Sequence, residues 1–146
     1  MKLFIATDHG ALEAKNHLVK FLNELGHEVE DLGTHSTESC HYPEYASKLA
    51  REVVQQEGRG VLLCGSGIGV SVVANKYAGI TAALCRSIDD ARLSREHNNS
   101  NVICFGGRVS SHKEMEAMLK IWLETEFEGG RHEIRTNMFA ELGTKI

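Results

Sequence analysis

Hydrophobic positions along the chain switch between short continuous runs and helical spacing. The first run is LFIAT, residues 3–7. The residues that follow at i, i+3, i+4 and i+7 are Leu18, Phe21, Leu22 and Leu25. A short continuous run indicates a buried strand, and the later spacing puts an apolar face on a helix. Gly26 comes directly afterwards and favours a helix end there.

The same alternation recurs along the rest of the chain. The predicted strands are 3–7, 27–33, 61–64, 81–85 and 101–106. The predicted helices cover about 18–25, 46–53, 68–77, 87–96 and 111–122, and a last one begins near Arg131. Ser87 and Ser111 each stand three residues before an acidic residue, a spacing that is typical of helix starts.

Strands that alternate with helices predict a parallel sheet with right-handed crossovers. We therefore expect one Rossmann-like α/β domain over residues 1–146, with a five-stranded parallel sheet, helices on both faces and a C-terminal helix. In such sheets ligands bind beyond the carboxyl ends of the strands. The loops at that edge are then 8–10, 33–35, 64–69, 85–87 and 106–108.

Charge and cysteine content narrow the class of protein. The net charge of −4 argues against nucleic-acid binding, and no apolar run approaches the roughly 18 residues of a membrane span. The apolar run before Asp8 is too short for a signal peptide, so a cytoplasmic protein with reduced thiols is expected. The cysteines contain no CxxC pair, which argues against a zinc site. Cys40, Cys85 and Cys104 are expected to be small buried residues.

The stretch GSGIGV (65–70) follows the third predicted strand. It differs from the dinucleotide fingerprint G-x-G-x-x-G, which follows the first strand, because Val70 stands in the last glycine position. It also lacks the lysine of a P-loop. Alternate glycines let the backbone approach a ligand with its N–H groups, and the helix that follows favours negative charge. The stretch therefore predicts a small anion hole.

Cys64 enters this predicted anion hole from the end of a strand. A helix N-terminus and free N–H groups beside a thiol favour its thiolate form. Such a thiolate suits nucleophilic acyl transfer, and it equally suits proton abstraction next to a carbonyl group. The residues alone leave both chemistries open, and a core cysteine at a strand end is a third interpretation.

Two further sets of residues suggest binding chemistry. His97 and Asn98 close the fourth crossover helix, and we expect them at the active edge of the sheet. Arg131 and Arg135 stand four apart, hence on one face of the last helix, where two guanidinium groups would hold a phosphate. His9 and Arg108, which follow the first and fifth strands, are expected to join the same pocket.

Five ordered stretches cover most of the chain: ATDHG (6–10), DLGTHSTESCHYPEYA (31–46), LLCGSGIGVSVVANKYAGITA (62–82), LSREHNNSNVICFGGRV (93–109) and FEGGRHEIR (127–135). Together they resemble the B-type ribose-5-phosphate isomerases and the related galactose-6-phosphate isomerase subunits. One departure is Thr81, where arginine is common in the family. A second is Ser66, where many members have threonine, so the hydroxyl is kept.

The resemblance implies an aldose–ketose isomerase that works through an enediolate without metal or cofactor. It assigns Cys64 as the general base and His97 as the acid/base group that opens the furanose ring. The residues that it assigns to the enediolate oxygens are Gly65, Ser66, Gly67, Ile68 and Gly69. The other substrate ligands that it implies are Asp8, His9 and Asn98, with Arg108, Arg131 and Arg135 for the phosphate.

The resemblance also implies homodimers, some of them paired into tetramers, whose sites are built from both subunits. The expected substrate is ribose 5-phosphate in the pentose phosphate pathway. Allose 6-phosphate, galactose 6-phosphate and a tetrose phosphate are the alternative substrates. Two alternative hypotheses for the function are a non-catalytic nucleotide-binding module and a cysteine hydrolase. A harmless replacement of Cys64 would favour the module, and a covalent thioester would favour the hydrolase.

Overall fold

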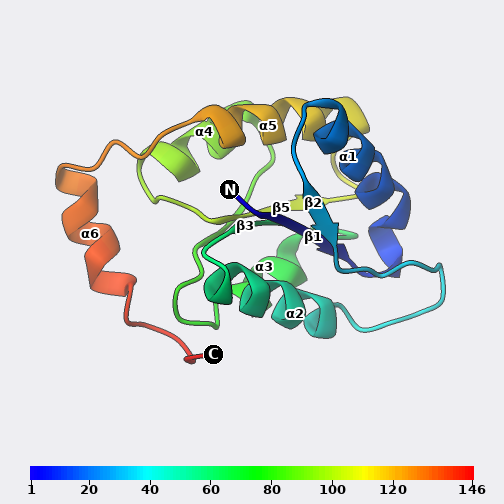
Figure 1. Cartoon of the computed structure of the whole chain (residues 1–146), viewed down its shortest axis with the longest axis horizontal. Coiled ribbons are helices and arrows are strands. Elements are labelled where there is room, and N and C mark those ends of the chain that lie inside the picture. The colour runs from blue at the N-terminus through cyan, green and yellow to red at the C-terminus, as the bar shows by residue number, and fades with distance from the viewer.

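Five parallel strands form one sheet in the order β2-β1-β3-β5-β4 in the computed structural model, which describes all 146 residues (Figure 1). The strands are β1 (Leu3–Thr7), β2 (Val29–Asp31), β3 (Arg59–Cys64), β4 (Ala82–Leu84) and β5 (Val102–Gly106). The predicted α/β fold with one parallel sheet is confirmed. The second strand ends earlier than predicted because the Asp31 carboxylate accepts the N–H of Gly33 at 2.9 Å, which turns the chain into a loop.

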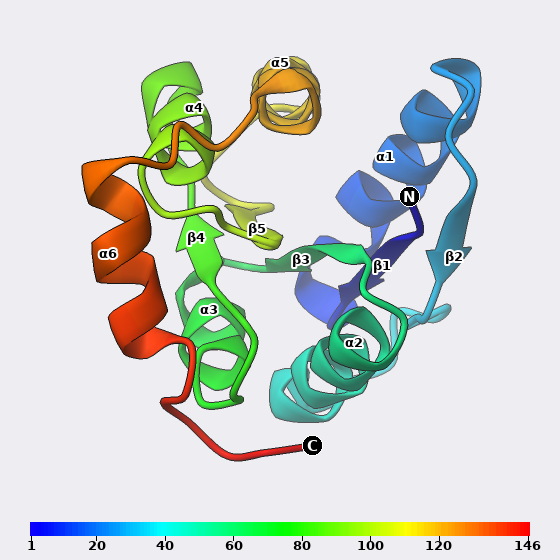
Figure 2. The same ribbon diagram turned by 60° about the vertical axis from the view of Figure 1, so that its left-hand side comes forward.

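Helices cover both faces of the sheet, as predicted (Figure 2). They are the 3-10 turn η1 (His9–Ala11), α1 (Leu12–Glu24), α2 (Tyr42–Gln55), α3 (Ile68–Ala74), α4 (Ile88–Glu96), α5 (His112–Glu124) and α6 (Arg131–Phe139). The predicted starts at Ser87 and Ser111 are confirmed, because each hydroxyl accepts a backbone N–H three residues on. Helix α3 ends three residues earlier than predicted, since the Asn75 side chain exchanges two hydrogen bonds with the backbone of Ala82.

Alternate side chains of each central strand supply two hydrophobic cores. In β1, Leu3 and Ile5 pack with α1, α4 and α5, whereas Phe4 and Ala6 pack with α2 and α3. Strands that are buried on both faces read as continuous apolar runs, which is why LFIAT shows no alternation. The two layers of helices are seen above and below the sheet in Figure 2.

The strand order places the loops that matter at one edge. The chain leaves β1 for one side of the sheet and reaches β3 on the other, so a switch point lies between these neighbouring strands. Cys64 of β3 stands opposite Gly106 of β5, and backbone bonds of 2.9 Å join Gly107 to Cys64 and Arg108 to Gly65. The loops after β1, β3 and β5 therefore meet at the carboxyl edge.

Helix α6 stands at one side of the body, away from α1 and α2 (Figures 1 and 2). Its apolar side chains Ile134 and Met138 are 67% and 75% exposed. They stand four apart and so share one face of the helix. This face lacks an apolar partner within the chain. No helix is long and apolar enough to cross a membrane.

Candidate active site

Cys64 is the last residue of β3 and is buried. Its sulfur accepts the backbone N–H of Gly67 at 3.1 Å. Gly67 has a φ of +79°, in the left-handed region that favours glycine, and this turn brings its N–H back toward the thiol. An N–H aimed at sulfur stabilises negative charge there. The loop thus places a backbone donor directly against the thiol of Cys64.

The other two glycines of the loop make room for protein side chains. A Cβ on Gly65 would lie 3.0 Å from the Arg108 guanidinium, and one on Gly69 would lie 2.7 Å from the Tyr42 ring. The space beside these two glycines is therefore filled by protein side chains, and the approach of their N–H groups to a ligand stays a prediction. Tyr42 was missed, although it stands in the motif DLGTHSTESCHYPEYA.

Ser66 lies half-exposed at the tip of the loop. Its Oγ accepts the N–H of Ile68 at 3.1 Å, which leaves its own hydroxyl hydrogen free to point outward. Arg86 donates to the Ser66 carbonyl at 2.9 Å and fixes the loop from the end of β4. Arg86 was not predicted as a site residue, although its loop at the carboxyl edge gave the signal.

Asp8 and His9 follow β1 at the same edge. The buried Asp8 carboxylate accepts the N–H of Gly10 at 2.9 Å. His9 Nδ1 accepts the N–H of Cys40 at 3.2 Å, so a neutral His9 carries its hydrogen on Nε2. His9 therefore offers a donor. Arg108 approaches from β5, since its guanidinium lies 3.8 Å from the position of a Cβ on Gly10.

The cysteines outside the loop differ from one another. Cys85 and Cys104 are buried, as predicted. Burial raises the pKa of the Cys85 thiol to about 12 and the pKa of Cys104 well above its usual range, so both stay neutral. Cys40 was expected in the core, but it is only half-buried, with its sulfur 3.8 Å from His9. The reason is that the 34–41 loop runs over the surface at the carboxyl edge.

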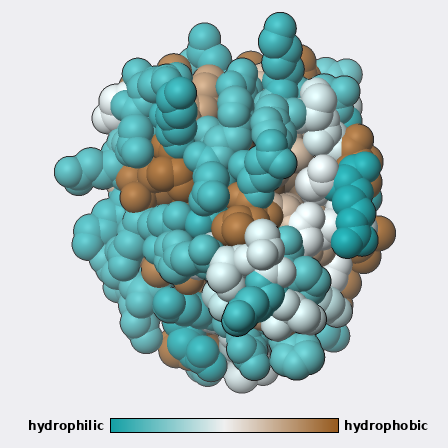
Figure 3. Space-filling model, turned by 90° about the vertical axis from the view of Figure 1, so that its right-hand side faces the viewer, coloured by the Kyte–Doolittle hydropathy of each residue, from teal (hydrophilic) through white to brown (hydrophobic).

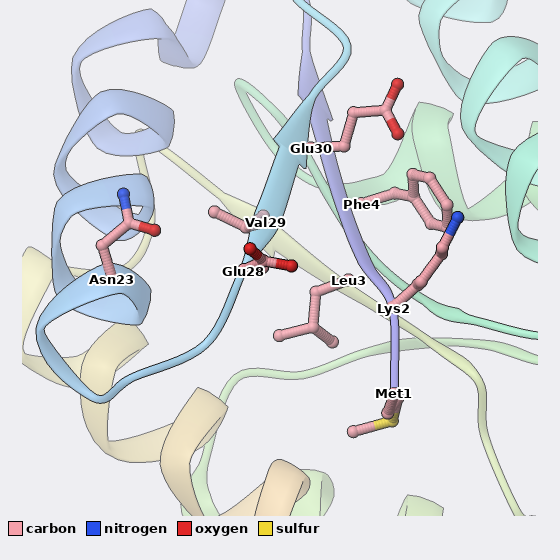
Figure 4. A pocket seen from close by; sticks show the side chains of 8 residues that line it. All are labelled: Met1, Lys2, Leu3, Phe4, Asn23, Glu28, Val29 and Glu30. Atoms are coloured by element: carbon pink, nitrogen blue, oxygen red, sulfur yellow. The ribbon is translucent and has the colours of Figure 1, made fainter.

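The face of the molecule on the side of the 34–41 loop is mainly hydrophilic, with small separate apolar patches (Figure 3). A hollow of about 510 Å³ opens there and is lined in part by His9, Gly10 and Gly107. Another hollow, of about 480 Å³, lies where β1 and β2 begin (Figure 4). It is lined by Met1, Lys2, Leu3, Phe4, Asn23, Glu28, Val29 and Glu30. The second hollow is at the amino edge, far from Cys64.

His97 and Asn98 do not lie at the active edge, so that prediction is wrong. Helix α4 begins after β4 at the carboxyl edge and returns the chain to the amino edge, where β5 begins. His97 caps the end of this helix. Its ring stacks on that of His132, with centroids 4.2 Å apart, and His132 lies 3.4 Å from the Glu128 carboxylate.

Arg131 and Arg135 are exposed on α6, next to His132. In one chain they therefore join His97, and Arg108 stays with Cys64. The first group, at the carboxyl edge, is Asp8, His9, Cys64, Gly65, Ser66, Gly67, Ile68, Gly69 and Arg108. The second group is His97, Asn98, Arg131 and Arg135. Within one chain, His9 and Arg108 therefore do not share a pocket with Arg131 and Arg135.

Comparison with known proteins agrees with this architecture. Residues 3–139 match the family Ribose/Galactose Isomerase. Ribose-5-phosphate isomerase B of Escherichia coli is 43% identical over 92% of this chain and 91% of its own length. Two solved structures superpose closely, the ribose-5-phosphate isomerase B of Clostridium thermocellum and that of Mycoplasma genitalium with bound ribulose 5-phosphate.

The Clostridium structure has a TM-score of 0.94 and 42% identity, with 96% of this chain and 95% of that chain covered. The Mycoplasma structure has a TM-score of 0.92 and 35% identity, with 95% and 93% covered. The fold is a Rossmann-like sheet, and the glycine loop after its third strand holds a cysteine thiol and is not a nucleotide fingerprint. This combination defines a class of α/β enzymes. The chain belongs to the ribose/galactose isomerase family, as its motifs predicted.

Proposed function

We propose that the protein interconverts ribose 5-phosphate and ribulose 5-phosphate as an aldose–ketose isomerase. The observation that carries the proposal is the Cys64 thiol, buried at the end of β3 with the Gly67 N–H 3.1 Å from its sulfur. A base beside backbone donors is the requirement for forming an enediolate. The relatives that bear the name of this reaction support the substrate.

Cys64 is the general base of the proposed reaction. Its thiolate takes the proton from C2 of the open-chain aldose, and the electron pair forms a C1–C2 double bond with negative charge on O1. The O2 hydroxyl proton then passes to O1 through the hydroxyl of Ser66. Finally Cys64 returns its proton to C1, which leaves a ketone at C2. The loop from Gly65 to Gly69 binds the enediolate oxygens with its N–H groups.

The remaining residues of the carboxyl edge hold the substrate. His9 donates from Nε2 to a sugar oxygen, in keeping with the bond that its Nδ1 accepts from Cys40. One oxygen of the Asp8 carboxylate accepts the N–H of Gly10, and the other accepts a hydrogen bond from a sugar hydroxyl. Arg108 offers an exposed guanidinium to the phosphate.

A second subunit completes the site in our proposal. His97, Asn98, Arg131 and Arg135 lie together at the amino edge, on the end of α4 and the start of α6. A two-fold homodimer brings this group from one subunit over the Cys64 loop of the other, and symmetry then makes two equal sites. His97 of the second subunit protonates the ring oxygen as the furanose opens. Arg131 and Arg135 of the same subunit bind the phosphate together with Arg108 of the first.

Two exposed apolar faces support this arrangement. Ile68 and Val72 are about half exposed on α3, four residues apart and directly after the Cys64 loop. Ile134 and Met138 show the same spacing on α6, directly after Arg131. If the start of α6 approaches the partner's Cys64 loop, these two faces meet. Their burial removes apolar surface from water and stabilises the dimer.

We propose the cytoplasm as the cellular location of the protein, because thiols stay reduced there. All cysteines are free, which agrees with it.

The substrate is tested by comparing kcat/KM for ribose 5-phosphate, allose 6-phosphate and galactose 6-phosphate at equal enzyme concentration. We expect the highest kcat/KM for ribose 5-phosphate. A higher value for a six-carbon phosphate would reassign the substrate and keep the isomerase chemistry. No turnover of any sugar phosphate by a folded dimer would contradict the isomerase itself.

A further inference from the structure

Three metal-ligating side chains converge outside the Cys64 loop. The candidate ligand atoms of His97, Glu128 and His132 all lie within 4.8 Å of one another. His132 Nε2 is already 3.4 Å from a Glu128 carboxylate oxygen. These residues come from the end of α4, the segment before α6 and the first turn of α6.

The backbone around this cluster holds it in place. The Glu128 N–H donates to the carbonyl of Glu96 at 3.1 Å, which ties the segment before α6 to the end of α4. His132 is only 9% exposed. The Glu96 carboxylate is occupied by Arg92 at 3.0 Å and does not join the cluster. The three ligands therefore sit on a common frame.

Two imidazoles and one carboxylate form a ligand set that suits Zn²⁺ and leaves a fourth position for water. Bonds of 2.0–2.1 Å in a tetrahedron put neighbouring ligand atoms about 3.4 Å apart. His132 and Glu128 already have this separation. The ring of His97 is nearly parallel to that of His132, at 15°, so one ring must turn to aim its lone pair at the same ion. Imidazole ligands favour transition metals over Mg²⁺ and Ca²⁺.

We propose that His97, Glu128 and His132 form an inhibitory site for a divalent transition-metal ion, with Zn²⁺ as its best match. Bound Zn²⁺ takes the lone pair of His97 and holds the imidazole away from the sugar ring. The binding stands on the cluster alone, whereas the inhibition rests on the proposed function.

A second set of the same residue types gives a matched control. His17 stacks on His112 at 4.5 Å and lies 2.7 Å from Glu116, on α1 and α5. Its ligand atoms do not converge as those of the first cluster do. Substitutions at Glu116 and His17 remove the same types of side chain from a cluster that we do not expect to bind a metal ion.

Zinc binding is measured by calorimetry on the chelator-stripped dimer, titrated with ZnCl₂ at pH 7. We expect one Zn²⁺ per chain. Loss of one ligand by Glu128→Gln or His132→Gln should weaken binding at least roughly tenfold, and Glu116→Gln and His17→Gln should leave it unchanged. Glu128 is exposed, so Glu128→Gln keeps the fold even if His132→Gln disturbs it.

A Zn²⁺ affinity that is unchanged in Glu128→Gln but lost in Cys64→Ala would place the ion on the thiol and overturn the proposed site. The absence of Zn²⁺ binding to the wild type would also overturn it. In the second measurement, stoichiometric Zn²⁺ should slow conversion of ribose 5-phosphate by wild type much more than by Glu128→Gln. Equal slowing of both would overturn the inhibition. Zinc binding by a protein without isomerase activity would contradict the proposed function and keep the metal site.

Discussion

Cys64 and His97 lie at opposite edges of the sheet of one chain. Cys64 stands opposite Gly106, the last residue of β5, and His97 precedes Val102, the first residue of β5. Five residues of strand separate the two edges by about 13 Å. No side chain spans that length through a packed core. Each residue therefore needs a second chain if both act on one sugar.

Cys64→Ala removes the proposed general base. The loss of kcat should be on the order of 10² to 10⁴, the usual contribution of such a group. Cys64→Ser should be nearly as inactive, because a hydroxyl is far less acidic than a thiol. The fold should persist, since alanine also fits the apolar environment of this buried position. Stopped-flow kinetics and circular dichroism measure the two quantities, and near-normal turnover of either variant would remove Cys64 from the mechanism.

His97→Ala removes the proposed ring-opening group. Conversion of ribose 5-phosphate, which is mainly a furanose, should become much slower. Conversion of ribulose 5-phosphate should keep most of its rate, because this ketose cannot close into a furanose. Initial rates in both directions are compared before equilibrium is reached. An equal loss in both directions would assign His97 to the proton transfer between C1 and C2 instead.

Arg131→Gln and Arg135→Gln remove proposed phosphate ligands. Each charge-assisted hydrogen bond contributes roughly 1.5–3 kcal/mol, so binding of ribose 5-phosphate should weaken accordingly. Binding of unphosphorylated ribose should barely change. Arg51→Gln, at an exposed arginine on α2, is the control and should affect neither sugar. A parallel loss for ribose and its phosphate would mean that α6 is merely displaced.

A buried ion pair fixes the strand next to the site. Lys15 is fully buried on α1, and its ammonium lies 2.6 Å from the Asp31 carboxylate on β2. Asp31→Asn leaves this charge without a counter-ion and should lower the free energy of unfolding by about 3–5 kcal/mol. Asp89→Asn breaks the exposed pair with Arg92 and should lower the free energy of unfolding far less, because solvent screens this pair. Urea unfolding compares them, and equal small losses would show that Lys15 finds another partner.

Most of the fold could be predicted from the sequence because the apolar residues of the core alternate regularly between continuous runs and helical spacing. Runs such as LFIAT face two layers of helices, and helices begin where Ser87 and Ser111 supply a cap. The boundaries that differ depend on single side chains. Asn75 bonds the backbone of Ala82, far along the chain, and no local pattern reveals this contact.

The residues of the site were recognisable by their motifs, but their placement was only half predictable. Cys64 ends a strand, so its position at the carboxyl edge follows from the order of the elements. The same argument puts the end of α4 at the amino edge, so His97 should have been placed there from its position after a crossover helix. The contact between Tyr42 and Gly69 joins segments with no shared pattern. A site completed by a second chain leaves no trace in local periodicity.

The most direct test of the shared site mixes two inactive variants. Cys64→Ala and His97→Ala are unfolded together in equal amounts and refolded, so that half of the dimers are mixed. Each mixed dimer then holds one intact site and one site that lacks both groups. Activity should return to roughly a quarter of the wild-type level, by two-fold symmetry and random pairing. If mass spectrometry verifies the mixed dimers and no activity returns, Cys64 and His97 do not act in one site across the interface.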